Sequence, residues 1–584
     1  MKMNAAADQP AHASNQYWRG HGSLNLKRVF SGVAIVVVLV ACWRAAEIRP
    51  AALVEPEAIA SVLSFLRGLF PPDLSLPFLR VVGAATLQTL AIGIAGTALS
   101  IVISIPMGML ATPVLWQRGV LVAGKPSGIG YFFYATLSRA TRALLGFLRA
   151  VPDLVWALLF VVAVGLGSLA GTLALAISYA GVLGRVYADV FDDVDRGALE
   201  ALQATGATRS QIFLFGIWPQ AAPSVAAYTL YSFECCVRAA SVLGFIGAGG
   251  IGYEISISMR LFEYGQVLTL LATLLLLVAA TDAVSRFIRR RLHANAPAGS
   301  LAHQRINDET PPSQLKQRAA ALLLLILLAG SFYFAGFYDL LRANSGLFAR
   351  SVRFIGQMFP PDLDPAFLRS LAVPLIQTIG ISVMGTLIGV VIGAALALPA
   401  TSTVVLGEAD EAARSSLREQ LAWRAVYYGA RFALSLLRSI PELVWVLVCV
   451  LAVGLGPFAG TLAIGLHTGG VLGKLYGETL EEVPAKPVEA LRAVGAHPLQ
   501  VFAWGIWPQA RAILLSYTVL RWDFNLRVST ILGLVGGGGL GLAIYNNVQL
   551  AFYQRVTTLI AIVYVLVIVT DWLGDRLRGQ RTAL

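Results

Sequence analysis

The sequence predicts an all-α integral membrane protein of about 12 transmembrane helices, arranged as two parallel six-span repeats that form a pseudo-dimer. Three observations predict this class. Hydrophobic residues make up 57% of the 584 residues and charged residues only 13%, about half of the roughly 25% expected for a soluble domain. Several apolar runs approach the ~20 residues that a spanning helix needs. The two halves of the chain also repeat the same motifs in the same order.

The internal repeat keeps a constant register. Three motifs recur 289 positions apart, and they begin at Phe70 and Phe359 (FPPDL), at Ala170 and Ala459 (AGTLA), and at Gly216 and Gly505 (GIWPQA). Such a register indicates a gene duplication without gaps in this region. The predicted organisation has four parts, which are a cytoplasmic N-terminal tail (1–28), a first repeat (29–292), a polar cytoplasmic linker (293–317) and a second repeat (318–584).

Each repeat contains six predicted spans. In the first repeat they lie near 29–46, 83–112, 150–167, 169–190, 219–245 and 264–285, with an amphipathic stretch at 56–69 that we expect at the outer membrane interface. In the second repeat they lie near 319–338, 371–399, 439–456, 458–479, 508–535 and 556–574. Because six is even, both repeats enter the membrane in the same direction, which predicts a pseudo-two-fold axis along the membrane normal.

The net charge is +12, and many of the basic residues lie at the ends of the apolar runs. Basic residues flank the apolar runs at Lys27, Arg28, Arg286, Arg289, Arg290, Arg291, Lys316, Arg318, Arg576, Arg578 and Arg581. These positions all fall on one side when even numbers of spans separate them, so the positive-inside rule places both termini in the cytoplasm. The first apolar run ends without an A-x-A-like site, which indicates a retained span. The bilayer accounts for the positive charge, and no nucleic-acid partner is expected.

A loop with a fixed spacing lies between the fourth and fifth spans of each copy. In the first copy Glu200 and Ala201 precede Gly206, and in the second copy Glu489 and Ala490 precede Gly495. A proline follows each glycine after thirteen positions, where it can begin the next span. A short cytoplasmic helix that a glycine ends is a stiff projection for a neighbouring subunit to hold. An ordinary connection between helices is the alternative, but two copies with the same spacing argue against it.

This loop resembles the E-A-A-x₃-G-x₉-I-x-L-P loop of ABC importer permeases, although Gly216 and Trp218 replace its Ile and Leu. Wider stretches are similar to the phosphonate permease family of ABC importers. They are LRAVPDLVWAL (148–158) and YSFECCVRAASVLGFIGAGGIGYEI (231–255), with LRSIPELVWVL (437–447) and LRWDFNLRVSTILGLVGGGGLGLAI (520–544) in the second copy. The resemblance implies a type I ABC importer fold, with both transmembrane halves in one chain of the bacterial cytoplasmic membrane.

The same resemblance implies partners and cofactors. Two copies of an ABC ATPase subunit, which would hold ATP and Mg²⁺, are expected at the Glu–Gly loops, and a phosphonate-type substrate-binding protein is expected outside the membrane. This chain itself is expected to hold no cofactor or metal and to catalyse no reaction, because it lacks a phosphate-binding loop and other catalytic motifs. An ion-coupled secondary transporter of a small anion remains an alternative, as does, more remotely, a membrane-embedded enzyme.

A glycine-rich segment ends the fifth span of each copy. Gly247, Gly249 and Gly252 have the G-x-G-x-x-G spacing of a dinucleotide-binding turn. That turn requires a preceding strand and an acidic residue about 20 positions later, and both are missing here. We therefore expect a hinge or gate, with close helix packing as the alternative. The residues of this set are Gly247, Gly249, Gly250, Gly252, Gly536, Gly538, Gly539 and Gly541.

The fifth span of each copy also carries charge. Glu234 and Arg238 are four positions apart, as are Asp523 and Arg527, so an acid and a base share one helical face and can pair. Ionisable residues within a span are candidates for function. Arg238 and Arg527 could bind a phosphorus oxyanion through charge-assisted hydrogen bonds. Alternatively, each pair only neutralises itself and fixes the helix.

A third repeated motif surrounds a proline at the start of the third span. Its residues are Arg149, Pro152 and Asp153 in the first copy and Arg438, Pro441 and Glu442 in the second. The proline begins or kinks the span, and its charged neighbours suit the cytoplasmic interface. These residues are candidates for an inner gate, with a plain helix start as the alternative. His467, which aligns with Ser178, is expected to be a packed polar residue, and the four cysteines are expected to be buried without a metal.

Overall fold

The apolar runs of the sequence form long helices in a computed structural model, which describes residues 26–116, 129–294, 314–338, 346–402, 417–497 and 500–579. Most of the predicted N-terminal tail and of the linker lies outside these residues. The described part of the chain contains helices and no strands. Six helices are long and apolar enough to cross a membrane, or up to nine when each bent pair counts as one span. The other three predicted spans correspond to α1, α13 and α22.

The helices of the first copy follow the predicted order. They are α1 (Leu26–Ala45), α2 (Pro56–Gly68), α3 (Leu76–Ala111), α4 (Pro113–Trp116), α5 (Ile129–Ala150), α6 (Asp153–Val164), α7 (Ser168–Asp192), α8 (Arg196–Ala204), α9 (Arg209–Ile212), α10 (Trp218–Leu243), α11 (Ile251–Arg260) and α12 (Tyr264–Ala294). The predicted amphipathic stretch is α2.

The second copy repeats this arrangement. Its helices are α13 (Gln314–Phe334), α15 (Gly346–Gln357), α16 (Pro365–Ser370), α17 (Ala372–Ala400), α20 (Leu417–Ser439), α21 (Glu442–Val453), α22 (Pro457–Glu481), α23 (Ala485–Ala493), α25 (Trp507–Leu532), α26 (Gly539–Gln549) and α27 (Tyr553–Gly579).

Small residues bring the central helices of each half together. Gly96 of α3 packs against Leu175 of α7, and Gly389 of α17 packs against Thr468 of α22. Without a side chain at these positions the helix backbones approach closely, which stabilises helix pairs where lipid gives no hydrophobic driving force.

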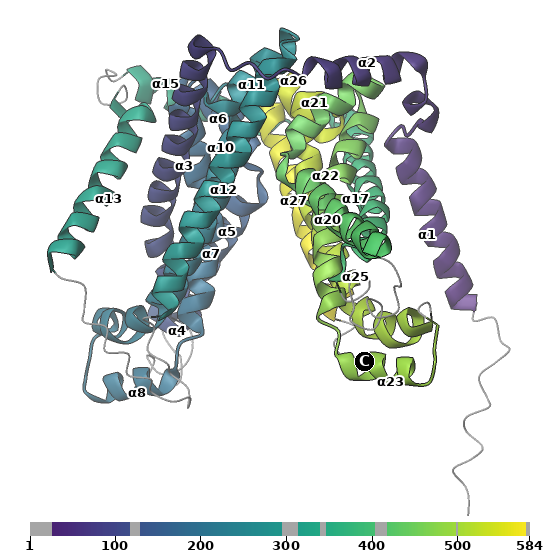
Figure 1. Ribbon diagram of the computed structural model, residues 1–584. Coiled ribbons are helices and arrows are strands. Elements are labelled where there is room, and N and C mark those ends of the chain that lie inside the picture. Colours follow the sequence, from purple (N-terminus) through teal and green to yellow (C-terminus); the bar gives the residue numbers. More distant parts are fainter. Residues whose placement is uncertain are drawn as a thin grey trace, which may run out of the picture.

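The first helix of each copy packs against the other copy. In Figure 1, α1 lies beside α17, and α13 lies beside α3 on the other half. The amphipathic helices are exchanged too, because α2 packs on α21 and α15 packs on α6. Each half of the molecule therefore contains one span from the other repeat, an exchange that hydrophobic periodicity cannot predict.

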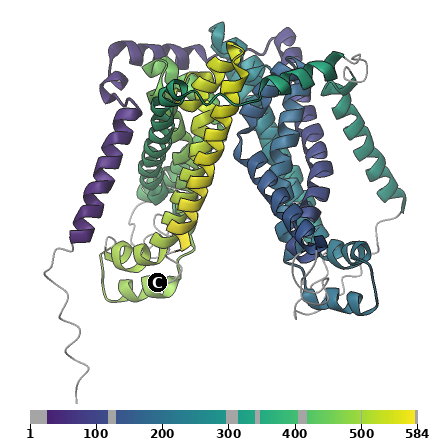
Figure 2. The same cartoon turned by 180° about the vertical axis from the view of Figure 1, so that it is seen from behind.

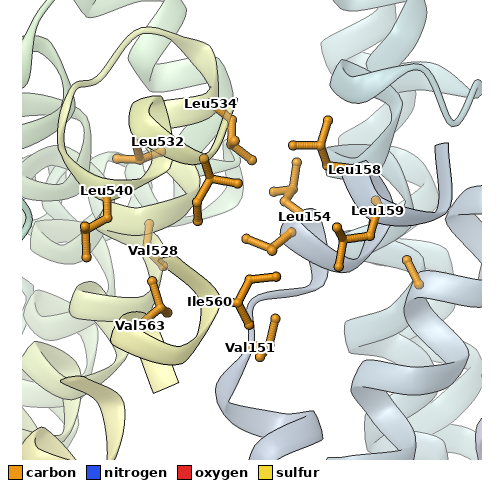
Figure 3. Packing of buried hydrophobic residues seen from close by; sticks show 14 of the residues in the cluster. Val151, Leu154, Leu158, Leu159, Val528, Leu532, Leu534, Leu540, Ile560 and Val563 are labelled. Atoms are coloured by element: carbon orange, nitrogen blue, oxygen red, sulfur yellow. The ribbon is translucent and has the colours of Figure 1, made fainter. Parts of the chain in front are cut away.

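Within the described residues, the two halves converge towards one end. Both views show them converging at the end that carries α11 and α26 and separating towards the end that carries α8 and α23 (Figures 1 and 2). Helix α6 makes the central contact, where Leu154 and Leu158 belong to one apolar cluster with Leu532 and Ile560 of the other half (Figure 3). The chain thus has a sealed end and an open end.

Candidate translocation path and coupling surface

The predicted Glu–Gly loops form the short helices α8 and α23. Glu200 and Ala201 lie on the exposed side of α8, whereas Leu199 is fully buried on its other side. Gly206 adopts a φ of 80° after the helix, and its amide donates to the carbonyl of Gln203 at 2.9 Å. Such a conformation favours glycine and ends the helix. The exposed face of α8 is therefore a stiff surface at the open end of the molecule.

The second copy presents the same surface. Glu489 and Ala490 are exposed on α23, and Gly495 ends the helix with a φ of 78°. Figure 1 shows α8 and α23 at the same end, one beneath each half. A partner with two equivalent sites can therefore contact both loops from one side.

Packing around Gly216 explains why the GIWPQA motif departs from the family pattern. A Cβ on Gly216 would lie 2.8 Å from Leu199 and 2.9 Å from Leu202, so glycine lets α8 sit directly against the start of α10. Residues Phe213–Ile217 form a π-helical turn there, as do Val501–Ile506 in the second copy. Pro219 and Pro508 are the second residues of the helices that follow, α10 and α25. Helix α8 is thus seated on the helix that continues into the glycine-rich segment.

The glycine-rich segments form tight turns at the sealed end. Three glycines of the first copy and three of the second have positive φ, and they are Gly247, Gly249, Gly250, Gly536, Gly538 and Gly539. The turn is fixed from the second span, since the amide of Gly250 donates to Oε1 of Gln88 at 2.8 Å and that of Ile251 donates to Oγ1 of Thr89 at 2.9 Å. The second copy repeats these bonds with Gln377 and Thr378.

Gly252 and Gly541 serve close packing. A Cβ on Gly252 would clash with the carbonyl oxygen of Ser241, and one on Gly541 would clash with that of Thr530. Helices α10 and α25 therefore lead closely into α11 and α26, with a bend of 43° in the second copy. At these two positions the geometry corresponds to the packing alternative, and whether the turns also act as hinges stays a prediction.

The prolines at the predicted third span lie at a sharp kink, one of the two roles predicted for them, but the predicted starts near 150 and 439 miss the helix before the kink. Helix α5 already runs from residue 129 to Ala150, and α6 then leaves at 89°; α20 and α21 bend by 97°. Pro152 and Pro441 occupy these breaks. A proline removes a backbone donor and disfavours helix in the preceding residue, which explains a break rather than a start.

A tryptophan side chain forms a hydrogen bond across each break. The sequence did not lead us to expect these bonds. Nε1 of Trp156 donates to the carbonyl of Leu148 at 3.3 Å, and Nε1 of Trp445 donates to that of Leu437 at 3.1 Å. These bonds satisfy carbonyls at the end of the first half-helix. The repeated P-[DE]-L-V-W pattern is the signal that could have revealed them.

An ion-pair network joins the two copies near one break. Arg149 of α5 donates to Asp571 of α27 at 2.8 Å, and Asp571 also accepts from Arg527 at 2.8 Å. Arg527 in turn contacts Asp523 at 2.7 Å, so the predicted i, i+4 pair is present in this copy. The Nε atoms of Arg149 and Arg527 are buried without a hydrogen-bond partner.

In the first copy the expected pair of Glu234 and Arg238 is replaced by pairs with α12. Glu234 accepts from Arg289 at 2.6 Å, and Arg238 lies 3.9 Å from Asp282. Arg289 reaches Glu234 from the neighbouring helix and takes the place of Arg238. The side chain of Arg238 is 51% exposed, against 21% for Arg527, so Arg238 is the more available cation.

The second break carries a different cluster. Nδ1 of His467 lies 2.9 Å from the carboxylate of Glu442 and 2.8 Å from the guanidinium of Arg521. Nε2 of His467 lies 3.2 Å from the carbonyl of Arg438. His467 is a packed polar residue, as predicted, but it has charged partners that sequence spacing did not reveal. Asp153 occupies the position of Glu442 in the first copy.

The four cysteines are free, and three of them are buried. The described residues contain no group of His, Cys, Asp and Glu side chains that could hold a metal ion.

Comparison with known proteins shows one family matching two segments of the chain, and relatives that cover either most or about half of it. The model of the family described as "Binding-protein-dependent transport system inner membrane component" matches residues 119–294 and 422–580. The phosphate-import permease protein PhnE of Mycolicibacterium smegmatis is 31% identical over 546 residues, which cover 93% of this chain and 92% of that protein. The phosphite transport system permease protein PtxC of Stutzerimonas stutzeri is 35% identical over 283 residues, covering 48% of this chain and 95% of that protein.

One solved structure, of the MetNI methionine ABC transporter in an inward-facing conformation, matches 38% of this chain and 99% of its own at 25% identity, with a TM-score of 0.32.

Proposed function

This chain belongs to the family of binding-protein-dependent transport system inner membrane components, and we propose that it translocates phosphonate or a related phosphorus oxyanion into the cell. It is the permease subunit of an ABC importer and a multi-pass membrane protein, not an enzyme, and ATP is hydrolysed by a separate subunit. The names of its relatives, which include phosphate import and phosphite transport, support this substrate class. So does the resemblance of both copies to phosphonate permeases.

The partners follow from the two equivalent loops. Two ATPase subunits bind at the open end, one on α8 through the exposed face around Glu200 and one on α23 through that around Glu489. ATP and Mg²⁺ belong to those subunits. A phosphonate-type binding protein delivers the anion at the sealed end. The positive-inside rule supports an orientation in the bacterial inner membrane with the open end and both termini in the cytoplasm.

The observation that carries the proposed mechanism is the contrast between the two ends. The halves pack together through α6 at one end and separate at the end that carries α8 and α23. Closure of the ATPase dimer draws α8 and α23 together, and Gly216 transmits this motion to α10. The apolar contact around Leu154 then opens, and the path faces the binding protein.

Three groups of residues act along this path. Arg238, the more exposed arginine, meets the anion, and Glu234 and Asp523 limit how tightly the anion is held. Arg149 and Arg527 hold the inner gate through Asp571. The remaining gate and hinge residues are Pro152, Asp153, Arg438, Pro441, Glu442 and the glycines of the two turns.

Uptake by the reconstituted assembly tests the function. The chain is placed in proteoliposomes with its ATPase subunits inside and its binding protein outside, and uptake of radiolabelled methylphosphonate, phosphite and phosphate is measured with and without internal ATP. Uptake that requires both ATP and the binding protein is expected. Uptake by the chain alone, driven by a proton or sodium gradient, would instead identify a secondary transporter.

A further inference from the structure

The cluster of Glu442, His467 and Arg521 occurs in only one of two copies that share a fold. The equivalent residues of the first copy are Asp153, Ser178 and Ser232, so the acid is kept while both basic groups are absent. The same helices pack in the first copy without this histidine and arginine. The fold therefore does not require the two basic side chains, and their presence calls for a functional reason.

The cluster lies where the two halves meet. Glu442 begins α21 at the break of the span, and the residue after it, Leu443, belongs to the same apolar cluster as Leu154 of the other half. Arg521 and His467 come from α25 and α22, the helices beside that break. Broken spans at the contact between repeats are where transporters place their substrate sites.

One hydrogen-bond donor of the cluster, Nε of Arg521, has no partner. Arg521 stacks on the ring of Phe524 at 4.5 Å, which covers one face of the guanidinium, and its Nε is buried without a hydrogen-bond partner. Phe524 itself is 44% exposed. A guanidinium with a covered face and an unpaired Nε has a donor left for an oxyanion.

The histidine cannot serve both of its neighbours at once. Nδ1 accepts a hydrogen bond from Arg521 when it is bare, and it donates to Glu442 when it carries a proton. The three side chains therefore have alternative hydrogen-bond patterns. Glu442 is the anion that now neutralises Arg521, at 3.5 Å. The three side chains are between 12% and 21% exposed, so a solute can reach them while Glu442 stays in place.

We propose that Arg521 and His467, held in place by Glu442, form an oxyanion subsite on the second copy's side of the translocation path. The subsite rests on the proposed function, since it assumes a phosphorus oxyanion as the transported species. It makes the path asymmetric: the first copy contributes Arg238 alone, whereas the second copy supplies a guanidinium and an imidazole. Phosphonate and phosphite above their second pKa are dianions, and they gain more from a guanidinium and a second donor than the monoanion hypophosphite does.

The first copy supplies the substitutions for the test. His467→Ser and Arg521→Ser install the residues that the same fold already carries at Ser178 and Ser232. Arg521→Ser is combined with Glu442→Gln, so that no carboxylate is left without its partner. The control is Arg511→Ala, which removes an exposed arginine from the same helix and installs the counterpart residue Ala222. Size-exclusion chromatography of each complete assembly checks that it forms.

ATP-driven uptake of methylphosphonate and of hypophosphite is then compared in proteoliposomes. We expect the double variant to lose dianion uptake by about tenfold or more and hypophosphite uptake by less than about threefold, with a smaller shift in the same direction for His467→Ser. The control should match the wild type. Equal losses for both anions, or no loss, in either variant would overturn the subsite while leaving the proposed function intact. No ATP-driven uptake by the wild-type assembly would overturn both.

Discussion

The partners of a charged residue in this chain depend on the copy in which it lies. Arg238 and Arg527 occupy equivalent positions, yet Arg527 contacts two carboxylates at 2.7 and 2.8 Å while Arg238 lies 3.9 Å from one. The sequence predicted which residues carry charge within the spans. It could not predict the partners, because Asp571 and Arg289 come from other helices and each forms its pair only through tertiary packing.

Asp571 should contribute more to stability than its counterpart Asp282. Asp571 accepts hydrogen bonds from both Arg149 and Arg527 and so joins the two copies. Asp571→Asn leaves two arginines with a weakened partner, and we expect a loss of roughly 1–3 kcal/mol of unfolding free energy, below the ~3–5 kcal/mol for a fully buried pair because the site is partly exposed. Thermal unfolding of the purified chain in detergent measures the effect.

Asp282→Asn is the matched control for this measurement. Its carboxylate has only the long contact with the half-exposed Arg238, so its unfolding midpoint should stay close to that of the wild type. Equal destabilisation by both substitutions would show that the network does not hold the copies together.

At the scale of elements, the sequence predicted where helices begin and end better than how they bend. The repeated prolines at 152 and 441 indicated a change in the third span, but helix α5 before the break was missed. Residues 129–150 mix apolar and basic side chains, so their hydropathy does not resemble that of a span. The short helices α8 and α23 end where the Glu–Gly spacing predicted, because Gly206 and Gly495 both adopt the positive φ that ends a helix.

The exposed faces of α8 and α23 should bind the ATPase subunits through their glutamates. Glu200→Ala combined with Glu489→Ala keeps both helices, because alanine is a strong helix former and neither side chain is buried. We expect each substitution to cost about 1–2 kcal/mol of binding, and hence the pair to weaken ATPase binding by at least about tenfold. Co-purification of the ATPase with the tagged permease at increasing dilution measures this loss.

Glu57→Ala provides the control, since Glu57 is an exposed glutamate on α2 at the opposite end of the molecule. It should leave ATPase binding unchanged. If the double variant retained the ATPase as well as this control does, the glutamates would not belong to the interface.

On the scale of the whole molecule, duplication predicted two equivalent halves, but the halves are not the two repeats. Helix α1 packs on α17 and α13 packs on α3, so each repeat donates its first span to the other. The constant register of 289 positions gives the repeat unit, whereas the choice of packing partner depends on side chains that periodicity leaves open. The closed contact at one end adds a second link between the halves through α6.

This exchange predicts that a chain cut in the linker stays assembled. Residues 1–303 and 304–584 are co-expressed as separate polypeptides, with an affinity tag on the first only, and the purified material is examined for the second. We expect near-equal amounts of both, because the exchanged spans and the apolar cluster around Leu154 still join them.

Leu154→Ala with Leu158→Ala removes side chains from the centre of that cluster, where each truncation costs roughly 2–5 kcal/mol, and should lower the recovery of the untagged piece. Recovery of the tagged piece alone from the unmodified pair would mean that the linker, and not the exchange of helices, holds the two repeats together.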